Sequence, residues 1–163
     1  MDSLSRTSIR EQIGAADPAA HATGASVRVL EPVGQFYVTG GALQEPNTRV
    51  GDGACVLWLA PDRTLVVADA PPDVAFVSDV TDGLVLFEIA GPRAGEIIAS
   101  GCTVDPAGPL LAPGRCVQTV FGGVKVVLYA FGNAFRLHAE RPFAAFLLEW
   151  LSRAVSALKG SSQ

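Results

Sequence analysis

The chain has 163 residues, a formal net charge of −4 and only 17% charged residues, against an average of about 25% for globular domains. Its 12 Lys and Arg residues are thinly spread, which excludes a nucleic-acid partner, and no apolar run approaches the roughly 20 residues of a membrane span. A length of this order suits one domain with its own core. Low surface charge leaves apolar side chains exposed, which predicts a protein partner.

Residues 1–25 are rich in Ser, Ala and Gly, with Ile9 and Ile13 standing isolated among them. A segment of this composition buries too little apolar surface to order itself. We therefore expect either a disordered arm or an arm that a partner orders, and a short tail at residues 160–163. The first 25 residues lack the apolar core of a secretory signal, which indicates a cytoplasmic protein.

Strand patterns fill residues 26–80, the first half of a single expected domain at residues 26–159. Val27 and Val29 alternate with polar or small residues, as do Phe36 and Val38 beyond the turn Glu31-Pro32-Val33-Gly34. The next two segments, 54–60 and 64–68, flank the turn Pro61-Asp62 and predict a β-hairpin. We expect these four strands in one sheet, followed by a weak strand or extended link at residues 74–80.

Residues 81–159 form the second half. The pattern predicts a strand at residues 84–89, and Gly91-Pro92 begins a helix because proline at the first helical position lacks only an N–H that the helix does not use. Gly101 stands where a left-handed helix cap is expected. The loop at residues 103–115 holds too many Pro and Gly residues for regular structure and predicts a functional or packed segment. Three strands follow, at residues 116–121, 124–130 and 134–139.

An amphipathic helix closes the domain. Pro142 begins it, and apolar residues recur at i, i+3, i+4 and i+7 spacing. The apolar positions are Phe143, Phe146, Leu147, Trp150, Leu151, Ala154, Val155 and Leu158. Leu148 widens this face beyond the usual stripe of about 100°. We expect Leu148 either as a scattered surface residue or as part of a flank that meets another chain.

The polar residues form no catalytic pattern. Cys55, Cys102 and Cys116 show no CxxC spacing, so neither a disulfide framework nor a zinc ribbon is indicated. No glycine-rich loop with a following Lys precedes a helix, as a phosphate-binding loop requires. His138 is expected as a hydrogen-bonded structural imidazole. The scattered carboxylates, which do not pair for acid–base work, are Asp79, Asp82, Glu88 and Asp105. We therefore predict no catalytic, cofactor or metal site in this chain.

A long loop carries a resemblance to a known family. Gly101-Cys102-Thr103-Val104-Asp105, followed by Pro113-Gly114-Arg115-Cys116-Val117-Gln118-Thr119, resembles the gamma subunit of heterotetrameric sarcosine oxidase. The likeness covers roughly residues 26–155. It includes Pro32-Val33-Gly34-Gln35-Phe36, Leu57-Trp58-Leu59-Ala60-Pro61-Asp62, Leu86-Phe87-Glu88-Ile89-Ala90-Gly91-Pro92, and Arg141-Pro142-Phe143 to Trp150-Leu151.

This resemblance implies an α+β fold of two ferredoxin-like halves with antiparallel sheets, related to the folate-binding domain of glycine-cleavage T-protein. It also implies alpha, beta and delta partner subunits. In such complexes the other chains hold FAD, FMN, NAD and tetrahydrofolate, the delta subunit binds zinc, and the gamma subunit is regarded as structural. Family members carry helices in the first half for which residues 39–54 and 69–80 are too short here, so we expect a shortened first half.

The resemblance makes the chain a non-catalytic gamma-type subunit of an enzyme that oxidatively demethylates sarcosine. Asp105 is followed directly by Pro106, where the family often has a His-Pro pair, so a related N-methyl amino acid stays open as the substrate. The residues expected at the interface are Cys102, Asp105, Pro113, Arg115, Gln118 and Leu148. The alternatives are a stand-alone folate-binding or aminomethyltransferase-like domain and an orphan remnant without partners.

Overall fold

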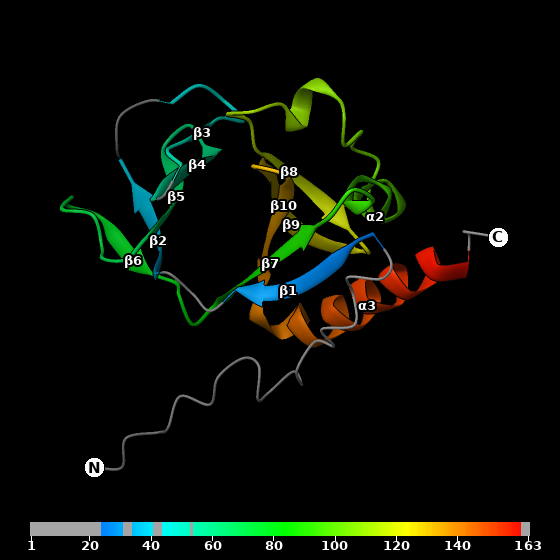
Figure 1. Ribbon diagram of the computed structural model, residues 1–163. Coiled ribbons are helices and arrows are strands. Elements are labelled where there is room, and N and C mark those ends of the chain that lie inside the picture. The colour runs from blue at the N-terminus through cyan, green and yellow to red at the C-terminus, as the bar shows by residue number, and fades with distance from the viewer. Residues whose placement is uncertain (1–23, 31–33, 41–43, 53, 161–163) are drawn as a thin grey trace, which may run out of the picture.

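Two five-stranded antiparallel sheets lie side by side in the computed structural model, and the helices pack against only one of them (Figure 1). The structure describes residues 24–30, 34–40, 44–52 and 54–160. The expected anchors Ile9 and Ile13 lie outside these residues. Within the described part, neither helix is long and apolar enough to cross a bilayer. The chain is thus an α+β protein, as its sequence predicts.

One of the two sheets, which we call the C-terminal sheet, has the strand order β1-β7-β10-β9-β8. Its strands are β1 (Ser26–Leu30), β7 (Leu84–Ala90), β8 (Val117–Phe121), β9 (Val124–Phe131) and β10 (Ala134–Glu140). The predictions for β7 to β10 are confirmed to within a residue. The β8–β9 turn requires glycine, because Gly122 and Gly123 adopt φ angles of +56° and +88°.

The second sheet, which we call the N-terminal sheet, has the strand order β3-β4-β5-β2-β6. Its strands are β2 (Gly34–Thr39), β3 (Arg49–Val50), β4 (Cys55–Ala60), β5 (Arg63–Ala68) and β6 (Val77–Asp79). The predicted hairpin is confirmed in β4 and β5, which pair antiparallel with a register shift near Ala60. Among the described residues between β2 and β7 there is no helix.

Strand β1 corrects the expectation that the first four strands share a sheet. It pairs with β7 in the C-terminal sheet, with Val27 opposite Ile89, whereas β2 pairs with β5 and β6. Val27 and Val29 are buried against the helices. Alternation with a period of two residues specifies which face of a strand is buried, but it is the same whichever sheet the strand joins. The sequence pattern therefore could not choose the partner of β1.

The main core lies between the C-terminal sheet and two helices, α2 (Ala94–Gly101) and α3 (Ala144–Gly160). Single 3-10 turns, η2 (Pro109–Leu111) and η3 (Arg141–Phe143), precede β8 and α3. The largest buried side chains here are Phe87, Ile89, Ile97, Ile98, Phe121, Leu128, Leu137, Leu147 and Leu151. A second core joins the sheets to each other. Its members are Cys55, Leu57, Leu65, Val67, Leu84, Cys116 and Tyr129.

Gly101 ends α2, but it is not the left-handed cap that its position suggests. Its φ is not positive, and the helix stops at Cys102, an extended residue (φ −147°) whose N–H bonds the Ile98 carbonyl. Glycine is needed for space instead, because a Cβ at this position would lie 2.3 Å from the ring of Phe121. That ring is fully buried. The close approach of α2 to β8 therefore depends on Gly101.

We expect Gly101→Ala to lower the free energy of unfolding by about 1–3 kcal/mol, since the added methyl overpacks a closed core. The matched control is Gly95→Ala in the same helix, where the new Cβ meets only Pro106 at 3.6 Å. That change should be neutral or stabilise by up to about 1 kcal/mol through helix propensity. Denaturant unfolding of both variants checks this, and equal stabilities would contradict the packing account.

Candidate subunit interface

The loop between α2 and β8 is held by its own anchors. Val104 and Leu111 are buried in the main core. The Asp105 carboxylate accepts a hydrogen bond from the Ala107 N–H at 2.9 Å, which closes a tight turn. Asp105 and Pro113 themselves are exposed. The loop is thus a shaped surface with some of the predicted interface residues on its outside.

The end of this loop joins the two sheets, a role the sequence did not predict. Arg115 forms an antiparallel bridge with Thr48, and the Gly114 carbonyl accepts the Arg49 N–H at 2.8 Å. Farther along, the Gln118 amide donates to the Leu59 carbonyl at 2.7 Å. No local pattern marks these contacts, because their partners lie about 60 residues away in the chain. Arg115 and Gln118 therefore hold the sheets together, whatever else they contact.

The two cysteines that bracket the loop are packed thiols. Cys116 is buried, and its thiol lies 3.1 Å from the Thr48 carbonyl oxygen. Burial raises the pKa of Cys116 to about 11, so it stays protonated at neutral pH. The Cys102 thiol donates to the Ile98 carbonyl at 3.4 Å. Among the described residues, no three His, Cys, Asp or Glu side chains lie together as metal ligands do.

His138 is the structural imidazole that the sequence predicts. It is 2% exposed, with Nδ1 at 2.6 Å from the Gln35 side-chain oxygen and Nε2 at 3.2 Å from the Tyr129 hydroxyl. Nδ1–H donates to Gln35 and the Tyr129 hydroxyl donates to Nε2, so both ring nitrogens are occupied. Burial lowers the pKa of His138 to about 3. The ring is therefore neutral, satisfied and removed from solvent.

Leu148 corrects the expectation of a surface or interface residue. It is 6% exposed and packs in the main core, whereas Phe143 and Phe146, assigned to the core stripe, are 45% and 51% exposed. The apolar face of α3 is wider than one sheet covers, and the helix turns so that Leu148 and Val155 face inward. The apolar flank left outside is therefore at Phe143 and Phe146.

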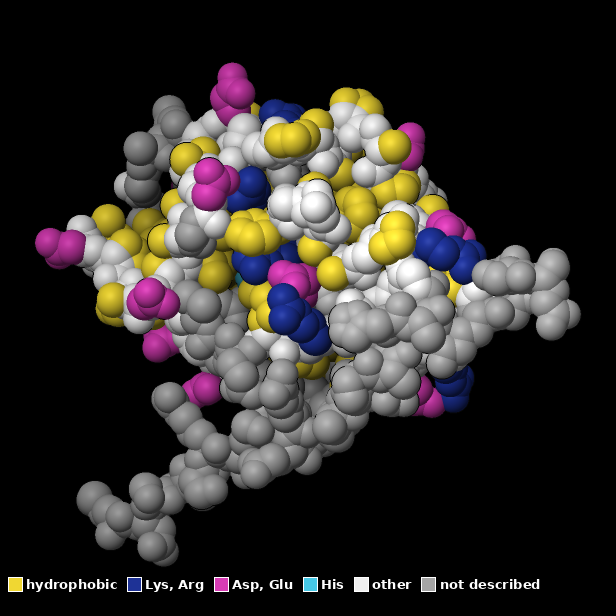
Figure 2. All heavy atoms as spheres, viewed as in Figure 1, with side chains coloured by type: hydrophobic (Ala, Val, Ile, Leu, Met, Phe, Trp, Pro, Cys, Tyr) yellow, Lys and Arg dark blue, Asp and Glu magenta, His cyan; other side chains and the backbone are white. Residues whose placement is uncertain are grey.

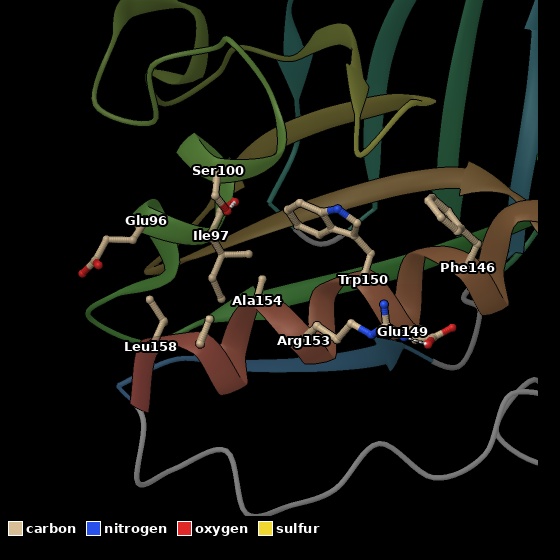
Figure 3. Close-up of a pocket in the computed structure, with 10 residues that line it drawn as sticks. Glu96, Ile97, Ser100, Phe146, Glu149, Trp150, Arg153, Ala154 and Leu158 are labelled. Carbon is tan, nitrogen blue, oxygen red and sulfur yellow. Dashed lines mark hydrogen bonds and ion pairs between the residues drawn. The ribbon is translucent and has the colours of Figure 1, made fainter. Parts of the chain in front are cut away.

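A groove of about 670 Å³ lies between α2 and α3. Figure 3 shows Phe146 and Trp150 projecting from the same side of α3, with Ile97 of α2 nearby. The Trp150 ring meets the buried Phe121 ring edge-on at 5.0 Å. Charged side chains at the rim are Glu96, Glu149 and Arg153. An apolar centre within a charged rim is the usual composition of a protein interface.

A second cleft, of about 880 Å³, opens between the sheets. Both ends of the loop border it, through Cys102 and Gln118, and the half-exposed Val120 lies beside them. The structure thus brings these two predicted residues to one cleft. Asp105, Pro113, Arg115 and Leu148 line neither the groove nor this cleft.

A solved structure shares this two-sheet α+β architecture over almost its whole length. It is a chain of heterotetrameric sarcosine oxidase from Corynebacterium sp. U-96 in complex with pyrrole 2-carboxylate. The TM-score is 0.79 and the sequence identity 19%, and the likeness covers 97% of this chain and 98% of that one. The fold is therefore one found in a heterotetrameric enzyme.

Two curated proteins of similar sequence indicate which subunit of such an enzyme the chain resembles. Both are sarcosine oxidase subunit gamma, and both are 24% identical to this chain. The match to the protein of Corynebacterium sp. strain U-96 covers 64% of this chain and 57% of that protein. The match to the protein of Corynebacterium sp. strain P-1 covers 84% of this chain and 77% of that protein. The chain thus spans little more than half of the first relative. No family model matches the sequence. The chain is related to the gamma subunits of sarcosine oxidase.

Proposed function

We propose that the chain is a non-catalytic, gamma-type subunit of a cytoplasmic heterotetrameric enzyme that oxidatively demethylates sarcosine or a related N-methyl amino acid. The observation that carries this proposal is the fold likeness across nearly all of both chains, together with the gamma-subunit relatives. The partners are alpha, beta and delta subunits, and FAD, FMN, NAD and tetrahydrofolate are held by those partners. The role of this chain is assembly and stability of the complex.

The condition of the chain's reactive groups supports a structural role. A general base needs a pKa near the working pH and a free ring nitrogen, whereas His138 is held neutral with both nitrogens bonded. A nucleophilic cysteine needs a lowered pKa, whereas burial raises the pKa of both Cys55 and Cys116. These side chains serve the packing of the two sheets.

The docking surface in this proposal has two parts. One is the groove between α2 and α3, with the exposed Phe146 as its anchor. The other is the outer side of the loop with Asp105, Pro113 and Arg115, beside the cleft that Cys102 and Gln118 border. Large aromatic side chains dominate the binding energy of protein interfaces. The two sheets, in this view, are ferredoxin-like halves related to the folate-binding domain of T-protein, with the first half shortened.

Co-expression with the neighbouring large subunits tests the proposal. We expect the chain to co-purify in a stoichiometric complex with sarcosine-dependent oxidase activity. A chain that stays monomeric and never co-purifies would contradict the proposal. Titration of the isolated chain with tetrahydrofolate tests the alternative of a stand-alone folate-binding domain, which micromolar binding would favour.

Arg115→Glu should weaken co-purification while changing the free energy of unfolding by no more than about 0.5 kcal/mol. The reason is that Arg115 contacts Thr48 through its backbone, so a new side chain leaves that bridge intact. Gln118→Ala is the contrasting variant. It removes the hydrogen bond to the Leu59 carbonyl and should cost about 1 kcal/mol of stability. Pull-down yields and thermal unfolding separate the two effects, and a large loss of stability in Arg115→Glu would contradict a docking role.

A further inference from the structure

Guanidinium groups from both sheets gather near Phe131 and one buried carboxylate. Glu88, only 5% exposed, accepts hydrogen bonds from Arg28 and, at 3.0 Å, from Arg136. Arg49, on β3 of the N-terminal sheet, comes close to Arg136, because both guanidinium groups lie over the Phe131 ring. Figure 2 looks onto this face, where dark blue and magenta side chains gather near the centre among apolar atoms. The C-terminal sheet thus brings two arginines to one buried carboxylate, and a third arginine faces them.

Arg49 is the member with too few partners. Its side chain is only 10% exposed, yet its Nε is buried without a hydrogen-bond partner among the described residues. One terminal nitrogen donates to the Gly51 carbonyl at 2.6 Å, and the other lies 3.7 Å from Asp52, a fully exposed carboxylate. Buried charges in proteins are normally paired and fully hydrogen-bonded. The guanidinium of Arg49 therefore lacks an acceptor on its buried side.

Two of these cations share one aromatic ring. The guanidinium carbon of Arg136 lies 3.5 Å from the centre of the Phe131 ring, and that of Arg49 lies 5.4 Å from the same centre. Tyr129 adds a second ring, 5.8 Å from Arg49. Ring faces attract cations, but they do not neutralise the repulsion between two of them. Arg28 and Arg136 share Glu88, and the Arg28 side chain is 63% exposed to solvent, whereas Arg49 has only the loosely held Asp52 as a counter-charge. The charge of Arg49 is therefore the least compensated of the three.

We propose that Arg49 and Arg136, whose guanidinium groups meet at the Phe131 ring, bind a carboxylate. Guanidinium groups match the planar, two-oxygen geometry of a carboxylate, and such charge-assisted bonds are about twice as strong as neutral ones. A single weakly compensated guanidinium charge, that of Arg49, favours a monoanion over a phosphate dianion. The rings of Phe131 and Tyr129 give the organic part of the ligand an apolar wall. The carboxylate belongs either to a free small molecule or to a partner chain that inserts it between the sheets.

Thermal unfolding of the purified full chain in sodium acetate tests this site, with sodium chloride and sodium phosphate at matched ionic strength as references. We expect acetate to raise the Tm saturably, above chloride and above phosphate. Arg49→Gln should weaken the acetate response at least tenfold, because it removes a charge-assisted bond. Arg153→Gln, an exposed arginine paired with Glu149 on α3, should keep the full response.

A second variant, Arg49→Lys, and an NMR signal of Arg49 itself distinguish loss of carboxylate binding from a folding defect. Arg49→Lys keeps the charge but lacks Nε and the planar fork, so it should fold and still lose most of the acetate response. The Nε–H resonance of Arg49 should shift on addition of acetate in the unmodified chain. Equal Tm values in acetate and chloride, or an undiminished response in Arg49→Gln, would overturn the proposal.

The assembled complex distinguishes the two sources of the carboxylate. If a partner chain supplies it, acetate raises the Tm of the free chain but no longer acts once the complex has formed. If a small molecule supplies it, the Arg49→Gln-sensitive response persists in the complex. The free-chain measurement needs no partner, so its result stands apart from the success or failure of the proposed assembly role.

Discussion

Phe146→Glu is expected to abolish co-purification of the chain with the subunits proposed above as its partners, while leaving its own Tm almost unchanged. Phe146 is 51% exposed at the groove between α2 and α3, so its replacement disturbs little of the core. A glutamate at that position adds a charge beside Glu149 on the rim and removes an aromatic anchor. Truncated hot-spot residues cost at least about 2 kcal/mol of binding, roughly thirtyfold in affinity.

The matched control for this prediction is Phe76→Glu. Phe76 is a phenylalanine with 71% exposure beside β6, on the N-terminal sheet and away from the groove. The Phe76→Glu substitution should leave assembly intact if the groove is the docking surface. Pull-downs and thermal unfolding of both variants provide the measurement. Wild-type assembly of Phe146→Glu, or an equal loss in Phe76→Glu, would show that the groove does not direct docking.

The free energy of unfolding is expected to fall by up to about 1.4 kcal/mol for each pH unit between pH 6.5 and 4.5. Burial lowers the pKa of His138 to about 3, from an ordinary value of 6.5. Between these values the unfolded chain binds a proton that the folded chain does not, so stability rises with pH. Above pH 6.5 the histidine is neutral in both states and stability is not reduced. As the pH falls from 6.5 toward 3, the free energy of unfolding decreases progressively.

One histidine variant isolates this effect. His138→Gln removes the titrating group, so it should lower stability at pH 7 and flatten the dependence of stability on pH between pH 4.5 and 6.5. Below pH 4.5 another group contributes, because burial raises the pKa of Glu88 but hydrogen bonds from Arg28 and Arg136 outweigh it and lower that pKa. Denaturant unfolding at each pH is the measurement, and a slope that survives in His138→Gln would contradict the assignment.

Local patterns predicted the elements well and their partners poorly. The hairpins β4–β5 and β9–β10 follow from alternation and tight turns, since both act over a few residues. The pairing of β1 with β7 joins segments about 60 residues apart, and nothing local in residues 26–30 specifies it. The same holds for the bridge from Arg115 to Thr48. Its existence makes the end of the loop a joint between sheets as well as a surface.

The spacing of apolar residues also could not predict which face of α3 is buried. Spacing placed Phe143 and Phe146 with the core residues, because a helical wheel cannot tell which edge of a wide apolar face the sheet covers. Tertiary packing buried Leu148 and left the two phenylalanines outside. The exposed apolar flank of this helix is therefore at Phe143 and Phe146, five and two residues before the Leu148 that the sequence suggested.

The amino-acid sequence by itself determined the α+β class, both helices, the strands other than β3, the structural role of His138 and the likeness to the gamma subunits, because these depend on short-range spacing and on motifs read directly. Only the tertiary structure decided which sheet β1 joins, which face of α3 is exposed, and that Arg49 and Arg136 meet at one ring. Those features arise from contacts between distant segments, whose geometry exists only once both sheets have formed.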